Sequence, residues 1–433
     1  MKETFKKAAV AFSLQIFGAS LSFFFSFVMA RMLGAEDVGI YLEVFNLAFL
    51  AALAGRIGLD NVILRFGAAS VEAGNYQEAA GLYRKSRQII GWGAGLLSLG
   101  LFLLAPWIAG TLFSKPEMAL PLRLMALSVL PFALLVLYTQ MLRSINEVRS
   151  SVFLINVSPT IGSLILLFIL APAYAVNGAV IAYTGGMVLS LIAGVWLWRK
   201  AAPHIRQLDG SYDTRRILST SLPMFWIALM SLLMNRADIL IMSSMVDSAS
   251  IGIYGTAKRT ALLMALLLTA VNSAVAPRFA ALYSQQDIES LSRLARLTSA
   301  LLALGALPVL LAFLLFAEPV MAIFGSEFTA GAPILSIIAI GQYLNVATGS
   351  VGFLLMMTGH EKLLRNILLL SMLINLLLLY VLIPPYGVIG AAVASMIGTG
   401  LLNVFSAIAV YRKLSINLIP LPDRLLMRWN SPH

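Results

Sequence analysis

The stretch GIYLEVFNLAFLAALAGRIGLDNVILRF, residues 39–66, returns in altered form near the middle of the chain. Adding 213 to each number carries the GIY of residues 39–41 onto the GIY of 252–254, and the RF of 65–66 onto the RF of 278–279. Further anchors follow in order: the same offset places Pro106 on Pro319, and an offset of 212 places Pro172, Tyr174, Gly178 and Ala182 on Pro384, Tyr386, Gly390 and Ala394. Ordered anchors at nearly one offset indicate a duplication. We therefore interpret the chain as two tandem repeats.

The composition is that of a membrane protein. Of the 433 residues, 60% are hydrophobic and 11% charged, and the mean hydropathy is +0.91, whereas a soluble globular chain is about 25% charged. The first apolar segment has about the length of a spanning helix and no clear small-residue cleavage site. We expect it to remain in place as the first span.

Twelve apolar runs approach the roughly 20 residues that a helix needs to cross hydrocarbon. They cover residues 8–32, 39–66, 88–112, 119–142, 152–171, 178–198, 219–245, 252–279, 297–316, 332–357, 366–383 and 388–411. The sequence thus predicts an all-α integral membrane protein with six helices in each of two lobes, residues 1–205 and residues 206–433, the second ending in a short cytoplasmic tail. Parallel repeats of this kind relate two lobes by a pseudo-two-fold axis along the membrane normal, and the substrate path commonly lies between them.

The loop charges predict the orientation. Most of the 30 basic residues fall on one side, in clusters such as 84–87, 199–216, 293–296 and 412–428, while the opposite loops are acidic, with Lys115 as their only clear cation. Because positively charged loops stay in the cytoplasm, we expect both termini to be cytoplasmic and the chain to be a multi-pass protein of the plasma (inner) membrane. The same loops account for most of the net charge of +11, so nucleic acid is not expected as a partner.

Several kinds of chemistry have no support in the sequence. There is no cysteine, hence no disulfide, thiol nucleophile or thiolate metal site. The three histidines, His204, His360 and His433, lie in polar connections or at the C-terminus. No phosphate-binding loop of the form G-x-x-x-x-G-K-[ST] is present. We expect no cofactor and no metal, and any driving force to come from the substrate or from a proton or sodium gradient.

Away from the ends of the predicted spans, charged residues are confined to the first two helices of each repeat. They are Arg31, Glu43, Arg56, Asp60, Arg236, Asp238, Lys258 and Arg259. A charge at the bilayer centre costs at least about 2.5 kcal/mol on insertion scales, so it normally faces a cavity or a partner. Five bases against three acids favour an anionic substrate. Shifted by 213, Glu43 corresponds to Thr256, Arg56 to Thr269 and Asp60 to Ser273, so the two lobes are predicted to differ in function.

Helical spacing suggests how these residues are arranged. On an ideal helix Glu43, Asn46, Arg56 and Asp60 fall within an arc of roughly 140° and could line one wet face. Arg56 and Asp60 stand four apart and can pair, either as a structural anchor or as part of a ligand site. Arg236 and Asp238 point some 200° apart, so one of them is expected to face a cavity. Arg31, Lys258 and Arg259 have a second interpretation as side chains that snorkel to the interface.

At residues 31–41 the chain reads RMLGAEDVGIY, which resembles the first hairpin of the polysaccharide-type flippases. These belong to a superfamily that also holds the multidrug and toxic-compound extruders and the lipid II flippases. The segments PAY at 172–174 with GA at 178–179, and PPYG at 384–387 with GAA at 390–392, resemble the turn into the sixth helix of each lobe. The resemblance covers about the whole chain.

The resemblance implies a V-shaped fold of two lobes, with helices one, two, seven and eight around a central cavity. It also implies movement of a polyprenyl-diphosphate-linked oligosaccharide, as for O-antigen, capsule or exopolysaccharide, from the cytoplasmic to the outer leaflet by alternating access. Polysaccharide polymerase and chain-length proteins would be its partners. Arg31, Arg56, Arg236 and Arg259 are candidates for contact with phosphate or with acidic sugars.

Other functions have specific signals that this sequence lacks. A cation-coupled drug extruder should carry an acid in its first span, but residues 8–32 contain none. A lipid II flippase usually has fourteen helices, and no run after Tyr411 is apolar enough to span. A sugar carrier of the other six-plus-six fold has a Gly-x-x-x-Asp-Arg loop where this chain reads AGNYQ at 73–77. A membrane scaffold would have no use for buried charge, and a glycosyltransferase would need clustered carboxylates. Of these, the extruder and the lipid II flippase remain as alternatives.

Overall fold

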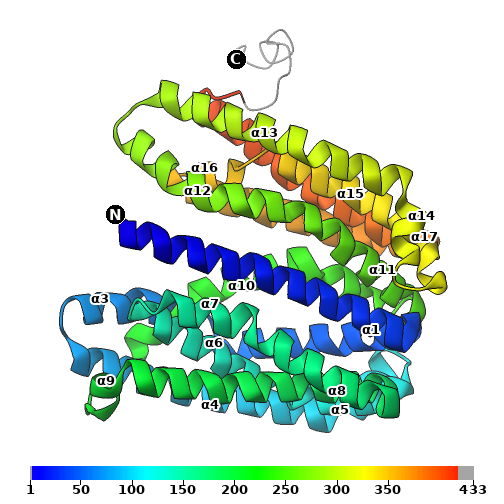
Figure 1. Cartoon of the computed structure of the whole chain (residues 1–433), viewed down its shortest axis with the longest axis horizontal. Coiled ribbons are helices and arrows are strands. Elements are labelled where there is room, and N and C mark those ends of the chain that lie inside the picture. Colours follow the sequence, from blue (N-terminus) through cyan, green and yellow to red (C-terminus); the bar gives the residue numbers. More distant parts are fainter. Residues whose placement is uncertain (1, 418–433) are drawn as a thin grey trace. The chain divides into compact units, whose positions relative to one another are not determined.

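The computed structural model describes residues 2–417, without the side chains of 2–9, 11, 273 and 274. The tail predicted beyond residue 417 lies outside the described residues. Across the described part the chain is helical and contains no strand, as predicted (Figure 1). Within it, nine helices are long and apolar enough to cross a membrane.

The chain forms two compact units. Unit 1 comprises Met1–Thr256 with Met321–Gly331, and unit 2 comprises Ala257–Val320 with Ala332–His433. Unit 1 contains α1 (Lys2–Arg56), α2 (Leu59–Val62), η1 (Ile63–Gly67), α3 (Ala68–Glu72), α4 (Tyr76–Trp107), η2 (Ile108–Leu112), η3 (Pro116–Met118), α5 (Ala119–Ala126), α6 (Val129–Ser144), α7 (Val148–Asn156), α8 (Ser158–Ala201), α9 (Pro203–Gln207), α10 (Thr214–Met242) and η5 (Ser326–Gly331). Unit 2 contains η4 (Leu262–Met264), α12 (Ala265–Ser284), α13 (Ile288–Leu315), α15 (Ala332–Ala347), α16 (Val351–Met357) and α17 (Glu361–Leu414), while α11 (Ser248–Ala261) and α14 (Ala317–Ala322) each have residues in both. These units do not coincide with the predicted lobes, and the lobe boundary between residues 205 and 206 stays a prediction.

Three of the long helices are hairpins. Non-helical backbone interrupts α1 at Gly34, α8 at Ala175 and α17 at Gly387. The rings of Phe25 and Tyr41, on either side of Gly34, lie 6.3 Å apart, whereas one straight helix would separate them by about 24 Å. Each hairpin therefore supplies two antiparallel segments. Counting them separately raises the number of long segments to twelve, although the number of membrane crossings itself stays a prediction.

Several predicted spans are not continuous helices. The span expected at 39–66 is broken where Ile57 and Gly58 both adopt positive φ, 48° and 72°, a conformation that is uncommon for a β-branched residue. The spans expected at 119–142, 252–279 and 332–357 are divided into α5 and α6, α11 and α12 with η4 between them, and α15 and α16. Hydrophobic length alone did not reveal these breaks, because a kinked helix and a straight one bury the same apolar residues.

The backbone repeats with the sequence. Helix α5 begins at Ala119 and α15 at Ala332, which is the offset of 213. Positive φ occurs at Asn146 and again at Gly359, also 213 apart, and the hairpin turns at Ala175 and Gly387 are 212 apart. Non-helical turns at matching positions support the duplication independently of the residue identities.

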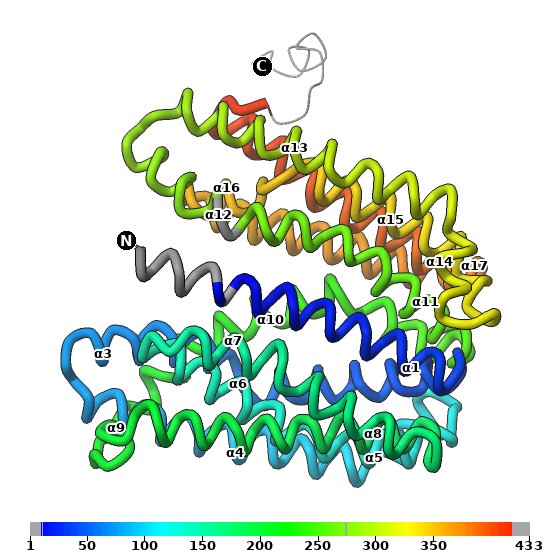
Figure 2. Tube along the Cα trace, viewed as in Figure 1, coloured from blue at the N-terminus to red at the C-terminus, as the bar shows by residue number. Residues whose placement is uncertain are grey.

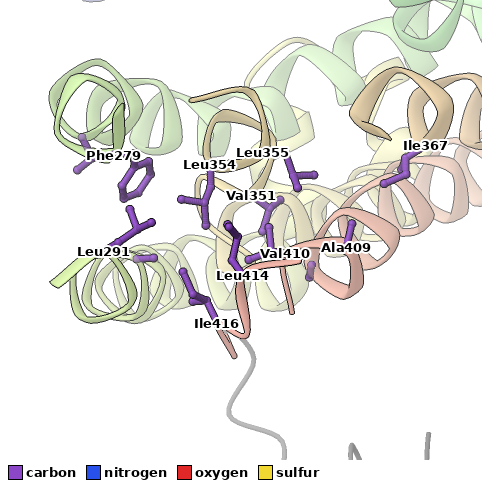
Figure 3. Close-up of a cluster of buried hydrophobic side chains, with 13 residues drawn as sticks. Phe279, Leu291, Val351, Leu354, Leu355, Ile367, Ala409, Val410, Leu414 and Ile416 are labelled. Atoms are coloured by element: carbon purple, nitrogen blue, oxygen red, sulfur yellow. The ribbon is translucent and has the colours of Figure 1, made fainter. Parts of the chain in front are cut away.

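Unit 2 has an apolar core in which a repeat anchor takes part. Phe279 packs with Leu291, Leu354, Leu414 and their neighbours, so that α12, α13, α16 and the end of α17 meet (Figure 3). Phe279 is 1% exposed. Many large apolar side chains on the outer faces of the long helices are exposed instead, among them Trp92, Leu103, Leu304, Leu315 and Tyr380. Such surfaces are expected to face lipid.

Candidate functional site

The two copies of the repeated GIY segment pack directly on each other. In unit 1, α10 and the beginning of α11 lie beside the second half of α1 (Figure 2). A Cβ atom added to Gly39 would collide with the carbonyl oxygen of Ser248, and one added to Gly252 would collide with that of Ala35. Because Ala35 matches Ser248 and Gly39 matches Gly252 under the offset of 213, the contact is reciprocal. Glycine is needed at both positions for the two backbones to approach so closely.

One turn beyond this crossing, Glu43 takes part in a buried ion pair. Its Oε1 accepts a hydrogen bond from Lys115 Nζ at 2.6 Å, and its Oε2 accepts one from Ser248 Oγ at 2.8 Å. Glu43 is fully buried, and the Lys115 side chain is 11% exposed. Lys115 lies in the loop between η2 and η3, as predicted, but its side chain reaches inward to Glu43 and not to solvent.

The helix α11 that provides Ser248 is capped just before it begins. Asp247 accepts hydrogen bonds from the N–H and the hydroxyl group of Ser250, both at 2.8 Å. Burial raises the pKa of the Asp247 carboxyl, but these hydrogen bonds outweigh burial and hold the pKa below its ordinary value. The charged cap fixes the first turn of α11 next to Ser248.

Asn46 and Arg236 form a second contact between α1 and α10. Arg236 Nη1 donates to Asn46 Oδ1 at 2.9 Å, and Asn46 Nδ2 donates to the carbonyl oxygen of Leu42 at 2.7 Å. The guanidinium carbon of Arg236 lies 4.4 Å from the centre of the Phe49 ring and 5.2 Å from that of Phe45. A cation over an aromatic face is attracted by the ring quadrupole and keeps its donor edges free of the ring.

The rings under Arg236 belong to an aromatic ladder, which we define as Tyr41, Phe45, Phe49, Phe132 and Tyr183. Neighbouring ring centres are 5.3 to 6.3 Å apart. Tyr41, Phe45 and Phe49 come from one face of α1, because residues four apart share a helix face. Phe45, Phe49, Phe132 and Tyr183 are half-buried. No prediction from the sequence included this ladder, although the spacing of four between Tyr41, Phe45 and Phe49 is visible there.

Arg56 stands at the other end of the ladder. Its guanidinium carbon lies 5.5 Å from the Phe132 ring centre, and Nη1 donates to Asp60 Oδ2 at 2.9 Å. The predicted pairing of Arg56 with Asp60 is confirmed. The predicted common arc, however, does not hold beyond residue 56, because α1 ends there and Asp60 lies on α2 after the break. The other carboxylate oxygen of Asp60, Oδ1, is buried without a hydrogen bond.

Asp238 points away from Arg236, as the helical spacing predicted. It is 2% exposed and accepts hydrogen bonds from the hydroxyl group of Tyr254 and from the N–H of Ile239. Arg236 contacts α1, whereas Asp238 contacts α11. The remaining predicted residues are more loosely characterised: Arg31 is exposed on α1, and Lys258 and Arg259 are half-buried on the part of α11 that belongs to unit 2. A role of any of these residues in substrate binding stays a prediction.

Among the described residues, no group of three or more histidine, aspartate or glutamate side chains could hold a metal ion. What unit 1 does contain is two guanidinium groups, those of Arg236 and Arg56, linked through the rings of Phe49 and Phe132. Planar, permanently charged guanidinium groups suit phosphate and carboxylate groups, because they donate two parallel hydrogen bonds.

Comparison with known proteins decides the family. The model of the polysaccharide biosynthesis protein family matches residues 4–283, which is more than half of the chain. The chain belongs to this family. A second model, MatE, matches residues 223–381. A curated relative is the probable low-salt glycan biosynthesis flippase Agl15 of Haloferax volcanii, 25% identical over 405 residues that cover 92% of this chain and 81% of that protein.

Solved structures share the fold. An inward-facing multidrug resistance MATE family transporter of the MOP superfamily covers 98% of this chain and all of its own, with a TM-score of 0.77 and 14% identity. The lipid II flippase MurJ in an inward closed conformation covers 98% of this chain and 93% of its own, with a TM-score of 0.71 and 16% identity. The predicted membership of the polysaccharide-type flippases within this superfamily is confirmed. With nine long apolar helices in its described part, the chain is a multi-pass membrane protein, and it has the fold of these two structures.

Proposed function

We propose that this polysaccharide biosynthesis family member moves a polyprenyl-diphosphate-linked oligosaccharide from the cytoplasmic to the outer leaflet by alternating access. The observation that carries the proposal is the Arg236 guanidinium lying over Phe45 and Phe49 beside Asn46. Diphosphates and acidic sugars accept paired hydrogen bonds from such a group. The C–H faces of sugar rings are weakly positive and fit the negative faces of aromatic rings. Arg236 and the aromatic ladder together thus offer a contact for an anionic group and a contact for a sugar ring.

Two further findings support this assignment. The family is that of polysaccharide biosynthesis proteins, and the relative from Haloferax volcanii is described as a probable glycan biosynthesis flippase. The basic excess among the charges inside the predicted spans favours an anionic cargo over the cations that multidrug extruders handle. The lipid tail of the substrate would stay in the bilayer while the polar part crosses.

The setting of transport belongs to the same proposal. The loop charges support a location in the plasma (inner) membrane with both termini in the cytoplasm. Polysaccharide polymerase and chain-length proteins would take over the glycan after transport. Any driving force would come from a proton or sodium gradient or from the substrate itself, because the chain contains no nucleotide-binding motif of the phosphate-loop type.

The test uses the purified protein in liposomes with a fluorescent oligosaccharide on polyprenyl diphosphate. A membrane-impermeant reductant bleaches the outer pool, so the bleached fraction reports crossing. We expect crossing with the protein, and a rate about tenfold or more lower in Arg236→Ala, the loss expected when a charge-assisted contact is removed. Arg293→Ala is the matched control, because Arg293 is 80% exposed and its pair with Glu289 lies at the surface.

Arg236 is a better probe than Arg56. Removing Arg56 would leave the Asp60 carboxylate without its ion-pair partner, so lost transport could reflect misfolding. Arg236 donates to Asn46 and lies over the rings of Phe45 and Phe49, so its removal tests the contact that carries the proposal. No crossing of the glycan lipid by the folded wild-type protein would contradict the proposal. Efflux of small organic cations in its place would favour a drug extruder, and crossing of lipid II alone would favour a lipid II flippase.

A further inference from the structure

We infer that Glu43, Lys115 and Ser248 form a latch that holds the beginning of α11 against α1 and opens in each transport cycle. The inference rests on the proposed transport, since a latch has a function only in a protein that changes conformation. Its three members come from separate segments: α1, the segment before η3, and α11. Both carboxylate oxygens of Glu43 are used, one for Lys115 and one for Ser248.

The position of the latch follows from the glycine crossing. At Gly39 and Gly252 the backbones of the two repeats approach too closely for any side chain. Contacts between glycine Cα–H groups and carbonyl oxygens are worth only about 0.5–1 kcal/mol each, so they allow the helices to separate once stronger contacts break. Among the hydrogen bonds described here, Ser248 Oγ to Glu43 Oε2 joins the two crossing helices directly beside these glycines.

The duplicated copy shows that packing does not require a charge here. Under the offset of 213, Glu43 corresponds to Thr256 and Lys115 to Phe328. Thr256 donates to the carbonyl oxygen of Gly252 within its own helix, and Phe328 is fully buried against Phe324. At the positions that match the charged pair, the second repeat therefore has a threonine and a phenylalanine. A buried ion pair is on average no more stabilising than apolar packing, and its best-attested role is to specify one arrangement.

A disulfide across the crossing tests whether it must open. The chain has no cysteine, so Leu42→Cys and Gly255→Cys can be introduced without background. A Cβ at Gly255 would meet the Leu42 side chain and lie 3.6 Å from its Cγ, which is close to disulfide reach. We expect oxidation of the double variant to reduce glycan-lipid crossing to the level of empty liposomes and reductant to restore it, with both single variants unaffected. Full transport by a completely oxidised protein would overturn the inference.

A second experiment tests the Glu43–Lys115 pair without measuring transport. Ala35→Cys places a reporter at the crossing, where Ala35 is 1% exposed, and a water-soluble maleimide measures its accessibility in detergent. In Glu43→Gln/Lys115→Met we expect labelling to be about tenfold faster or more, because the charge pair is lost without leaving either charge alone. The exchanged pair, Glu43→Lys/Lys115→Glu, should restore slow labelling.

The matched control is Thr256→Val at the corresponding position of the second repeat, which should leave labelling unchanged. Labelling that is equally slow in the neutral pair, or that the exchanged pair fails to restore, would overturn the latch. Labelling does not depend on the substrate. If the labelling results are as expected but the protein does not move the glycan lipid, the proposed function is wrong and the latch is not.

Discussion

The buried charged side chains of unit 1 have different kinds of partner. Glu43 is held by Lys115 and Asp60 by Arg56, whereas Arg236 contacts an amide and two aromatic rings. The first two contacts compensate charge with charge. Arg236 lies over two rings of the aromatic ladder, so in the proposed function an anion would meet the guanidinium where a sugar ring would meet the aromatic side chains. This is why Arg236 carries the functional proposal.

At the residue scale, Lys115→Met should strongly destabilise the protein. It leaves the fully buried Glu43 carboxylate without its cation, and breaking a buried pair in this way costs about 3–5 kcal/mol. The double variant Glu43→Gln/Lys115→Met should recover most of that loss, because no lone charge remains. Thermal unfolding followed by circular dichroism in detergent measures both. Arg293→Ala, from an exposed pair, should change stability by less than about 1 kcal/mol. Equal melting temperatures for the single and double variants would contradict the buried pairing.

Among the helices, the close crossing of α1 and α11 depends on two glycines. Gly39→Ala or Gly252→Ala should destabilise by at least about 1–3 kcal/mol, since the new methyl group meets a backbone carbonyl that cannot rotate away. Gly95→Ala is the control: a Cβ there meets nothing within 4 Å, and alanine favours the helix by up to about 1 kcal/mol. Denaturation of the three variants under one condition compares them, and similar behaviour at Gly39 and Gly95 would disprove the close crossing.

The stability contributed by the N-terminal cap of α13 should depend on pH. Asp287 caps it by accepting the N–H of Ser290 at 2.9 Å, and hydrogen bonds from the backbone and side chain of Ser290 lower the Asp287 pKa. Because the Asp287 pKa is lower in the folded protein, the cap contributes its full stabilisation above the pKa of the unfolded chain, about 3.9. The stabilisation is lost as the pH falls through the pKa of the folded protein. In Asp287→Asn, whose cap does not titrate, the decrease in melting temperature below about pH 4 should be smaller than in the wild type. An identical acid profile would show that the cap contributes nothing.

On the scale of the whole molecule, exposed apolar side chains predict where lipid lies. Trp92 is 75% exposed on α4, whereas Trp198 is 6% exposed and stacks edge-on against Tyr83. In liposomes containing brominated lipid, a variant that retains only Trp92 should lose much of its fluorescence, and one that retains only Trp198 should lose little. Quenching requires contact with bromine, so the pair distinguishes a lipid-facing side chain from a packed one. Strong quenching of Trp198 would show that this part of α8 is not packed as described.

The sequence predicted some features of the structure and not others. The hairpin turns and the membrane class follow from local composition, and the pairing of Arg56 with Asp60 follows from their spacing of four. The break at Ile57–Gly58 was not predicted, because the run from 39 to 66 remains apolar through it. The burial of Lys115 was not predicted, because its place in a loop gave no signal that its side chain reaches Glu43.

The sequence by itself determined the duplication, the all-helical membrane fold and the helices that hold buried charge, because these depend on composition, periodicity and a constant offset. Only the tertiary structure decided which partners a charged residue meets on segments distant in the sequence. Glu43 finds Lys115 and Ser248, and Arg236 finds Asn46 and the aromatic ladder, across distances in sequence that no local pattern spans. The physical reason is that a helix fixes the direction of its own side chains, whereas their partners depend on how separate helices pack, and here that packing is set by two glycines lying against each other's backbone.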